Sequence, residues 1–300
     1  MNDRDFRVTI PSAPISPNID NFLKIKILQV RPITYRGYYR RLFRFYKYAQ
    51  TDIVTEAILQ DFLTYISKKV GNSQYNQYLN TLKQYTRYLA DRRIIDSAEF
   101  LNSYKSKKKI VKREKHYYPD HEIEQFLNEV LTRKFPRWLY WFIWLGFQFG
   151  IRPKEMSLLE VTDINLENWT INLRSEITKT KVQSLLPIPT ILRPKIKQLL
   201  SWRKLQNTQS TRLFVNSWGD AITEGNLSNH RAALRAIDGK FTYYDMRYTA
   251  GWRCYERSGD IYLAARLLRH SDINQTKKYL QIEKEKALEQ MRKKFEEVYK

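Results

Sequence analysis

Two residues near the end of the chain, His270 and Tyr279, lie nine positions apart in the segment LLRHSDINQTKKYL (267–280). A tyrosine hydroxyl is a poor nucleophile until its proton is removed or its anion is stabilised by nearby positive charge. Lys277 and Lys278 directly precede Tyr279 and supply such charge. Most of the 21 tyrosines of the chain are expected to be packing residues. The spacing from His270 therefore singles out Tyr279 as a candidate nucleophile.

The overall charge indicates the class of partner. The chain has 53 Lys and Arg against 31 Asp and Glu over 300 residues, a formal net charge of +22. This excess suits a polyanion, and nucleic acid is the commonest one, although ribosomal proteins, nucleases and proteins that bind anionic membranes share it. Apolar residues at 42% argue against a disordered chain. We therefore expect a globular protein that binds nucleic acid.

Several other classes lack support in the sequence. Cys254 is the single cysteine, so no internal disulfide is expected, and the four histidines show no zinc spacing. There is no GxxxxGK[ST] loop for ATP, no signal-peptide pattern and no run of about 18 apolar residues that would span a membrane. We expect a cytoplasmic, nucleoid-associated protein without cofactor, metal ion or membrane contact.

Four short segments carry the remaining chemistry, and they follow one another along the chain as GIRPKE (150–155), TKTKVQSLLPIP (178–189), YDMRYT (244–249) and RHSDINQTKKY (269–279). In this order, on a chain with this charge, they resemble the motifs of the tyrosine recombinase family, the phage-integrase and Xer-like enzymes. The resemblance covers about residues 117–282 and extends more loosely to the N-terminal region. Tyr244 stands where the family usually has histidine, a change of a kind seen among archaeal and mobile-element members, and Arg269 stands where glycine is usual.

By this resemblance, Arg152 and Arg247 bind the phosphate that is cut, Glu155 accompanies Arg152, and Tyr279 is the nucleophile. Physical chemistry agrees, because attack on phosphorus adds negative charge to the non-bridging oxygens. Two arginines can hold these oxygens by charge-assisted hydrogen bonds. Either arginine alone would be interpreted as a surface or structural residue, since a basic chain has many.

Three further residues are assigned by the same resemblance. Lys179 corresponds to the family's hairpin lysine and would protonate the 5′ oxygen that leaves, with Lys181 as the neighbouring candidate; a lysine at a hairpin tip is otherwise an ordinary solvated residue. His270 would hydrogen-bond the phosphate or assist proton transfer from the tyrosine, unless it is a satisfied core histidine. Tyr244 can donate a hydrogen bond to the phosphate but does not titrate near neutrality.

The elements that would position these residues are mainly helical, with one exception. Residues 168–189 place Trp169, Ile171 and Leu173 at period two, followed by a polar turn and a second apolar run, which predicts a β-hairpin. Apolar residues at helical spacing lie on both sides of it. The expected fold class is mainly α with a small β-hairpin or sheet, which is the two-domain architecture of the tyrosine recombinases.

The domain organisation expected from these patterns is an N-terminal tail at 1–19, a helical core-binding domain at 20–104, a basic linker at 105–116 and a catalytic domain at 117–300. In the first domain, apolar spacing predicts helices over 33–50, 55–69 and 73–95, capped by Thr34, Thr55 and Ser73. The linker holds seven basic residues between 105 and 115, which suits a solvated connector close to a phosphate backbone.

A final helix is expected over 284–300, where one face carries Ala287, Leu288, Met291, Phe295 and Val298. Soluble proteins seldom leave such a stripe exposed, so it must pack on its own chain or on a neighbour. In tyrosine recombinases a C-terminal helix often inserts into the adjacent protomer.

The resemblance implies a site-specific recombinase that cuts and rejoins double-stranded DNA through a 3′-phosphotyrosine, without metal or ATP. Four protomers would act as a tetramer on two sites, each an inverted repeat. One alternative is a non-catalytic DNA-binding protein that has retained the fold, supported by Tyr244. A type IB topoisomerase would use the same chemistry, and a metal-dependent nuclease is opposed by the lack of a clear carboxylate cluster.

Overall fold

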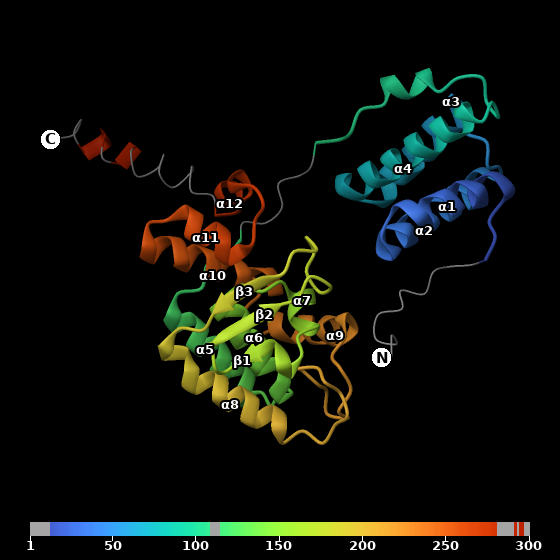
Figure 1. The fold of residues 1–300 in the computed structure, drawn as a ribbon. Coiled ribbons are helices and arrows are strands. Elements are labelled where there is room, and N and C mark those ends of the chain that lie inside the picture. Colours follow the sequence, from blue (N-terminus) through green and yellow to red (C-terminus); the bar gives the residue numbers. More distant parts are fainter. Residues whose placement is uncertain (1–12, 109–114, 281–290, 293, 297–300) are drawn as a thin grey trace. The chain divides into compact units, whose positions relative to one another are not determined.

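The computed structural model describes residues 13–108, 115–280, 291–292 and 294–296. The chain divides into two compact units, Met1–Arg113 and Glu114–Lys300 (Figure 1). Each unit has its own core of buried apolar side chains. Among the helices of these ranges, none is both long and apolar enough to cross a membrane.

The first unit contains α1 Pro17–Gln29, α2 Pro32–Ala49, α3 Glu56–Lys69, α4 Asn72–Asp91 and the 3-10 turn η1 Glu99–Ser103. The sequence predicts α2, α3 and α4, whereas α1 is additional and begins at Pro17, inside the segment expected to be a tail. Thr55 caps α3 as predicted, because its side chain accepts a hydrogen bond from the N–H of Ile58 at 3.3 Å. The predicted caps at Thr34 and Ser73 are wrong, because Arg31 and Gly71 already adopt the extended backbone that precedes α2 and α4.

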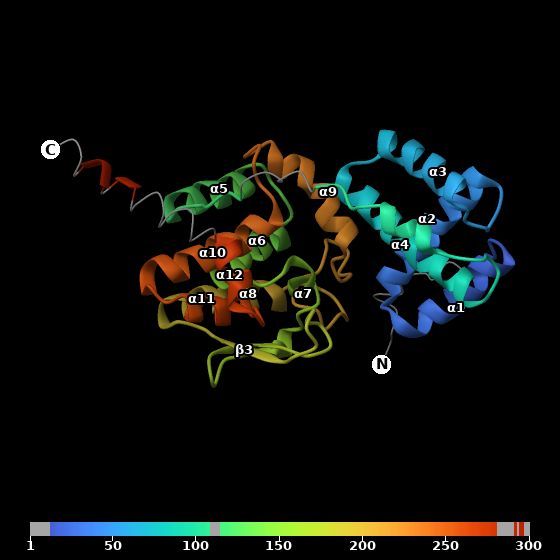
Figure 2. The same ribbon diagram turned by 90° about the horizontal axis from the view of Figure 1, so that it is seen from above.

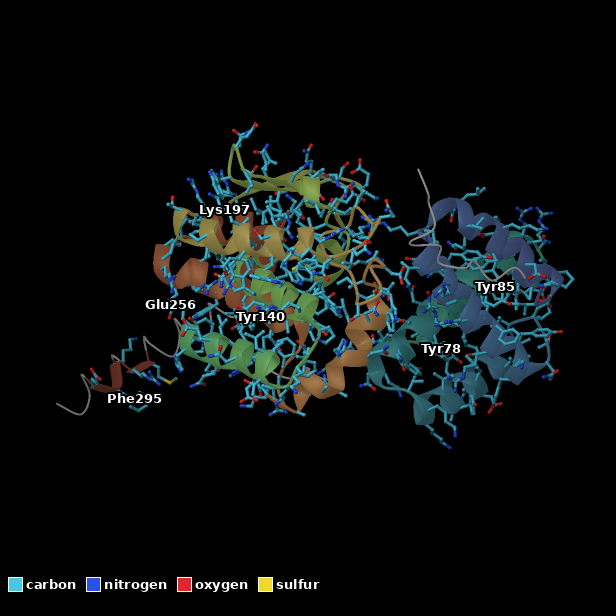
Figure 3. All side chains as sticks on the ribbon, turned by 90° about the horizontal axis from the view of Figure 1, so that it is seen from below. Tyr78, Tyr85, Tyr140, Lys197, Glu256 and Phe295 are labelled. Carbon is cyan, nitrogen blue, oxygen red and sulfur yellow. The ribbon has the colours of Figure 1, made fainter. Side chains whose placement is uncertain are left out.

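Tyrosines fill much of the core of the first unit. Tyr85 on α4 is fully buried, and its hydroxyl donates to the carbonyl of Asp52 at 2.8 Å. Figure 3 labels Tyr85 within this helical unit. Tyr38 on α2 is also buried, and its hydroxyl donates to the side chain of Gln84 at 2.9 Å. Since these buried hydroxyls have partners, both tyrosines act as packing residues.

The second unit contains α5 Asp120–Thr132, α6 Arg137–Phe149, α7 Pro153–Ser157, α8 Arg193–Lys204, α9 Glu224–Arg235, α10 Tyr243–Ser258, α11 Ile261–Leu268 and α12 Ile273–Leu280, with 3-10 turns η2 Val161–Asp163 and η3 Thr190–Leu192. Every residue of α6 from Trp138 to Phe147 is buried, so this helix forms the centre of the unit. α10 packs against both α6 and α11 (Figure 2). These three helices carry or adjoin the segments that the sequence singles out.

A three-stranded antiparallel sheet has the order β1 Ile164–Asn165, β2 Thr170–Leu173 and β3 Ser184–Pro187. The predicted hairpin is confirmed, because β2 pairs with β3 and Ile171 lies opposite Leu186. Trp169 does not belong to the strand as predicted: its φ of 51° is left-handed and places it in the turn before β2. The two-residue strand β1 was not predicted, since it is too short to show a period.

The helix expected over 284–300 falls mostly outside the described residues, and so do Ala287, Leu288 and Val298 of its apolar stripe. Two members of the stripe are described: Met291 is 56% exposed and Phe295 is 54% exposed. In the basic linker, residues 109–114 also lie outside the described ranges.

Candidate active site

The turn between α6 and α7 positions Arg152. α6 ends at Gly150, whose φ of 58° lies in the left-handed region. A Cβ at Gly150 would lie 3.1 Å from the Cβ of Ala250 on α10, so glycine is needed both for the backbone and for the close approach of α10. Two residues later, Arg152 is the N-cap of α7 and Pro153 begins the helix. The guanidinium of Arg152 is thereby held beside α10.

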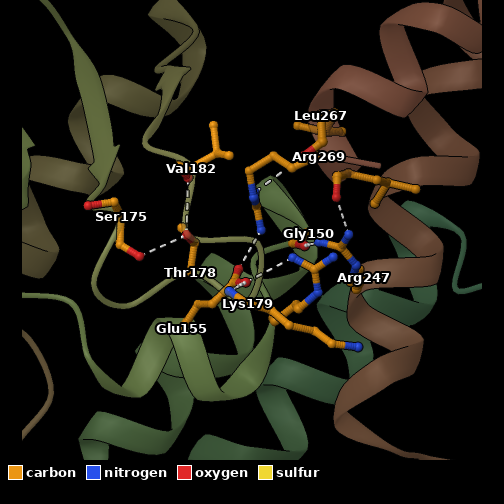
Figure 4. A network of polar contacts seen from close by, with 11 residues as sticks. Gly150, Glu155, Ser175, Thr178, Lys179, Val182, Arg247, Leu267 and Arg269 are labelled. Carbon is orange, nitrogen blue, oxygen red and sulfur yellow. Dashed lines mark hydrogen bonds and ion pairs between the residues drawn. The ribbon is translucent and has the colours of Figure 1, made fainter. Parts of the chain in front are cut away.

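Glu155 on α7 is a buried carboxylate that connects three parts of the chain (Figure 4). One oxygen accepts from Nη1 of Arg152 at 2.8 Å and from the backbone N–H of Lys179 at 3.2 Å. The other oxygen accepts from Nη2 of Arg269 at 2.7 Å. Burial alone would raise the pKa of Glu155, but Arg269 and Arg152 lower it below its ordinary value. The carboxylate is therefore ionised near neutral pH.

Arg269 occupies the position at which the resemblance leads one to expect glycine. It ends α11 with a φ of 51°, a conformation that strains a residue with a side chain by about 1 kcal/mol or more. Its side chain is only 8% exposed and forms the ion pair with Glu155. This ion pair offsets the backbone strain. Arg269 thus adds a third guanidinium to the site.

Arg247 on α10 is almost fully buried, and two backbone carbonyls orient it. Nη1 donates to the carbonyl of Gly150 at 2.6 Å, and Nη2 donates to the carbonyl of Leu268. Burial, with the positive charges of Arg152 and Arg269, lowers the pKa of Arg247. An arginine remains protonated at neutral pH even so, because its ordinary pKa is very high. The charge of Arg152 contributes to the lowered pKa of Arg247, so the two guanidinium groups lie close together.

His270, which precedes α12, lies beside Tyr279 near the end of that helix. Their ring centroids are 5.5 Å apart, and Nδ1 of His270 lies 2.9 Å from the hydroxyl of Thr276. Burial and then the charge of Arg247 lower the pKa of His270 to about 4, so the imidazole is neutral at physiological pH. Burial raises the pKa of Tyr279, although Arg247 opposes this effect. The hydroxyl of Tyr279 donates to the backbone carbonyl of Tyr244 at 3.3 Å.

The side chains of the other two predicted site residues, Tyr244 and Lys179, are exposed. The side chain of Tyr244 is 63% exposed, and it is the carbonyl of this residue that meets Tyr279. Lys179 is exposed, its backbone is fixed by Glu155, and its side chain extends in the direction of Arg247 in the view of Figure 4. Nζ of Lys181 instead donates to the carbonyl of Glu176 in its own turn at 3.1 Å.

Lys115 is a site residue that sequence reasoning missed. Its Nζ donates to the carbonyl of Tyr279 at 2.8 Å and lies 3.2 Å from the centroid of the Tyr279 ring. The sequence places Lys115 in the basic linker, and no spacing in the chain indicates its contact with a residue so far away.

The part of the chain that the structure describes holds no group of three His, Cys, Asp or Glu side chains placed to bind a metal ion.

Comparison with known proteins identifies relatives over nearly half of the chain. Tyrosine recombinase XerC of Histophilus somni (strain 2336) is 23% identical over 142 residues, which is 46% of this chain and 47% of that protein. Tyrosine recombinase XerC of Pseudomonas fluorescens is 26% identical over 141 residues, 46% of each chain. The chain thus spans about half the length of the curated relatives it matches.

Solved structures share the fold over most of the chain. XerH site-specific recombinase bound to palindromic difH substrate has a TM-score of 0.65 at 18% identity, covering 91% of this chain and 83% of its own. A lambda integrase dimer bound to a COC' core site has a TM-score of 0.70 at 15% identity, covering 88% and 76%. The Tn1549 transposon integrase in complex with a circular intermediate DNA has a TM-score of 0.71 at 17% identity, covering 88% and 95%.

These structures confirm the predicted fold class, mainly helical with a small antiparallel sheet. Residues 117–286, more than half of the chain, match the phage integrase family. They include the turn of Arg152, the hairpin, α10 and α12, which are the elements that form the site described above. The resemblance seen in the sequence is therefore confirmed, and the chain belongs to the phage integrase family of tyrosine recombinases.

Proposed function

We propose that this protein is a site-specific recombinase that cuts and rejoins double-stranded DNA through a 3′-phosphotyrosine at Tyr279. The observation that carries the proposal is the convergence of Tyr279 and His270 with the guanidinium groups of Arg152 and Arg247 in one half-buried cluster. Arg152 at the start of α7, Arg247 on α10 and Tyr279 on α12 meet there, although Arg152 is 95 positions from Arg247 and 127 from Tyr279. Such a cluster suits a phosphodiester, which carries negative charge and gains more during attack.

The reaction would be a transesterification. The Tyr279 oxygen forms a bond to phosphorus as it loses its proton, and the bond from phosphorus to the 5′ oxygen breaks. Arg152 and Arg247 stabilise the charge on the non-bridging oxygens. Lys179 gives its proton to the departing 5′ oxygen, which would otherwise leave as an unfavourable alkoxide. Attack by a 5′ hydroxyl on the phosphotyrosine reverses these steps, so neither ATP nor a metal ion is needed.

His270 and Tyr244 have narrower roles in this scheme. Because the pKa of His270 is lowered to about 4, its imidazole is neutral at pH 7 and acts as a hydrogen-bond partner or proton acceptor. The exposed hydroxyl of Tyr244 can donate to a phosphate oxygen, while its carbonyl holds the Tyr279 hydroxyl before DNA binds. Neither role requires the histidine that the family usually has at position 244.

The proposed recombinase function also implies how the protein assembles on DNA. The helical domain at 20–104 and the catalytic domain at 117–300, joined by the basic linker at 105–116, would both bind DNA, for which the net charge of +22 provides attraction. Four protomers would act as a tetramer on two inverted-repeat sites. We propose a cytoplasmic protein associated with the nucleoid.

One observation favours a second function, a DNA-binding protein without cleavage. The Tyr279 hydroxyl donates to the Tyr244 carbonyl, and burial raises the pKa of Tyr279, so both effects favour the neutral phenol over the phenolate that attacks phosphorus. If the protein is a recombinase, DNA binding breaks the hydrogen bond between the Tyr279 hydroxyl and the Tyr244 carbonyl. The hydroxyl then donates to the incoming phosphate beside the arginines.

Trapping of the covalent intermediate distinguishes the two functions. A nicked substrate that loses its 5′-hydroxyl fragment should accumulate a protein–DNA adduct with the wild type, in excess EDTA as well as without it. Tyr279→Phe should bind the same DNA with unchanged affinity and form no adduct. An adduct in the Tyr279→Phe protein would refute the nucleophile, dependence on a divalent metal would favour a nuclease, and binding without any wild-type adduct would favour the non-catalytic protein.

A further inference from the structure

Two contacts hold Lys115 against the proposed nucleophile. Its Nζ donates a hydrogen bond to the backbone carbonyl of Tyr279 at 2.8 Å and lies 3.2 Å from the centroid of the Tyr279 ring. The same ammonium lies 5.4 Å from the ring of Tyr248 on α10. The hydrogen bond to the Tyr279 carbonyl fixes the backbone of α12, and the contact with the Tyr279 ring fixes the plane of that ring. Together they restrict the direction in which the Tyr279 hydroxyl points.

An ammonium group on the face of a phenol also changes its chemistry. The cation is attracted to the π electrons, and this attraction grows when the phenol becomes a phenolate, because negative charge is then shared with the ring. The interaction is strongest where water is excluded, and Lys115 is only partly exposed. Lys115 therefore favours the ionised form of Tyr279 more than the neutral form.

We propose that Lys115 is a positioning residue for Tyr279, which orients the ring for attack and stabilises the phenolate as its proton leaves. This proposal rests on the function proposed above. It assigns to the last part of the basic linker a task within the active site, in place of the general attraction to DNA that the sequence suggests for this segment.

The surroundings of Lys115 predict how this support depends on pH. The charged and titratable groups that face it are Asp245, Arg247 and Tyr248 on α10, and His270 and Tyr279 at α12. Burial lowers the pKa of Lys115 to about 8, with Asp245 opposing this effect and Arg247 adding to it. The cation is present below this pH and is lost as the pH rises through it. The support for the phenolate should follow the same course.

The test measures single-turnover formation of the covalent adduct on a nicked duplex. Lys115→Met keeps the length of the side chain without its charge and should slow the reaction by roughly tenfold or more, the effect of a desolvated cation–π contact. The DNA concentration that gives the half-maximal rate should stay within about twofold of the wild type, because Lys115 acts on Tyr279 and not on binding. Lys115→Arg should restore most of the rate. Lys105→Met removes the same charge from the start of the linker, where its loss can weaken DNA binding, and should leave the rate at saturating DNA unchanged.

The pH profile separates electrostatic support from simple packing. The ratio of the wild-type rate to the Lys115→Met rate should be largest below pH 8 and should shrink above it, whereas the ratio for Lys115→Arg to Lys115→Met should stay constant. Equal rates for Lys115→Met and wild type, equal slowing by Lys105→Met, or a pH-independent ratio would each overturn the proposal. A wild type that forms no adduct would instead overturn the recombinase function, so the two failures are distinguishable.

Discussion

Glu155 makes it possible to bury several cations in one place. Guanidinium groups that approach one another away from water repel, and each is costly to bury without a partner. Glu155 divides its two oxygens between Arg152 and Arg269, at 2.8 and 2.7 Å. Three guanidinium groups, with that of Arg247, then face one carboxylate, so the site keeps a positive charge for a phosphodiester. The side chain of Arg152 is 19% exposed, against 2% for that of Glu155.

The role of Lys179 can be tested without disturbing this arrangement. Glu155 holds the backbone N–H of Lys179, so Lys179→Ala should leave the loop in place. Loss of a general acid should slow cleavage of an ordinary substrate by about 100-fold or more. A substrate with sulfur at the 5′ bridging position should be cleaved at nearly the wild-type rate, because a thiolate leaves without a proton.

Lys181→Ala is the matched control, since Nζ of Lys181 donates to the Glu176 carbonyl in its own turn. It should slow both substrates little. If Lys179→Ala slows the two substrates equally, or Lys181→Ala shows the sulfur-dependent effect, the proton comes from another group.

The sequence predicts the site residues that belong to a recognisable motif. It misses the residues whose role depends on a contact with a distant part of the chain. The resemblance to the family assigns Arg152, Arg247, His270 and Tyr279, and the structure brings these residues together. The ion pair of Arg269 with Glu155 and the contact of Lys115 with Tyr279 join positions 114 and 164 residues apart. No periodicity records such contacts, because they depend on how α7, α11 and α12 pack.

At the scale of elements, the hairpin was predictable and its details were not. Alternating Ile171 and Leu173 point to one buried face, and this pattern needs only β2 to be detected. β1 has two residues and cannot show alternation, and Trp169 has the left-handed backbone of a turn. The turn at Gly150 has a larger consequence, because it aligns Arg152 with α10 and offers its carbonyl to Arg247.

Gly150→Ala should destabilise the second unit by about 1 to 3 kcal/mol and reduce cleavage, since the added Cβ meets Ala250 and the backbone has a positive φ. Gly259→Ala is the matched control: it has a φ of +66° but nothing within 4 Å of the new Cβ. All seven tryptophans lie between residues 138 and 252, so their fluorescence in urea reports on the second unit. Equal losses in both variants would show that backbone strain alone matters and that the approach of α10 does not.

At the scale of the whole molecule, composition predicts the class of partner and little about assembly. The excess of 53 basic over 31 acidic residues indicates a polyanion, but charge does not determine how many protomers meet on it. Assembly depends on complementary apolar surfaces. The second unit has a cavity of about 980 Å³ whose lining combines apolar side chains such as Leu127, Trp144 and Leu263 with charged ones such as Asp120 and Arg253. Apolar surface of this kind can receive a helix with one apolar face.

Deletion of residues 284–300 tests whether the predicted terminal helix provides that face. The stripe of five apolar residues would bury several hundred Å² on docking, which at about 25 cal/mol per Å² contributes several kcal/mol to a protomer interface before the entropic cost of association. The truncated protein should fold and bind one DNA site, but it should lose cooperative pairing of sites and most strand exchange. The full-length variant with Met291→Ser and Phe295→Ser, whose side chains are exposed at 56% and 54%, should show the same loss without a change in length. Gel-shift and strand-exchange assays on paired sites provide the measurement. Recombination at the wild-type rate by both variants would mean that the stripe only covers its own chain and takes no part in assembly.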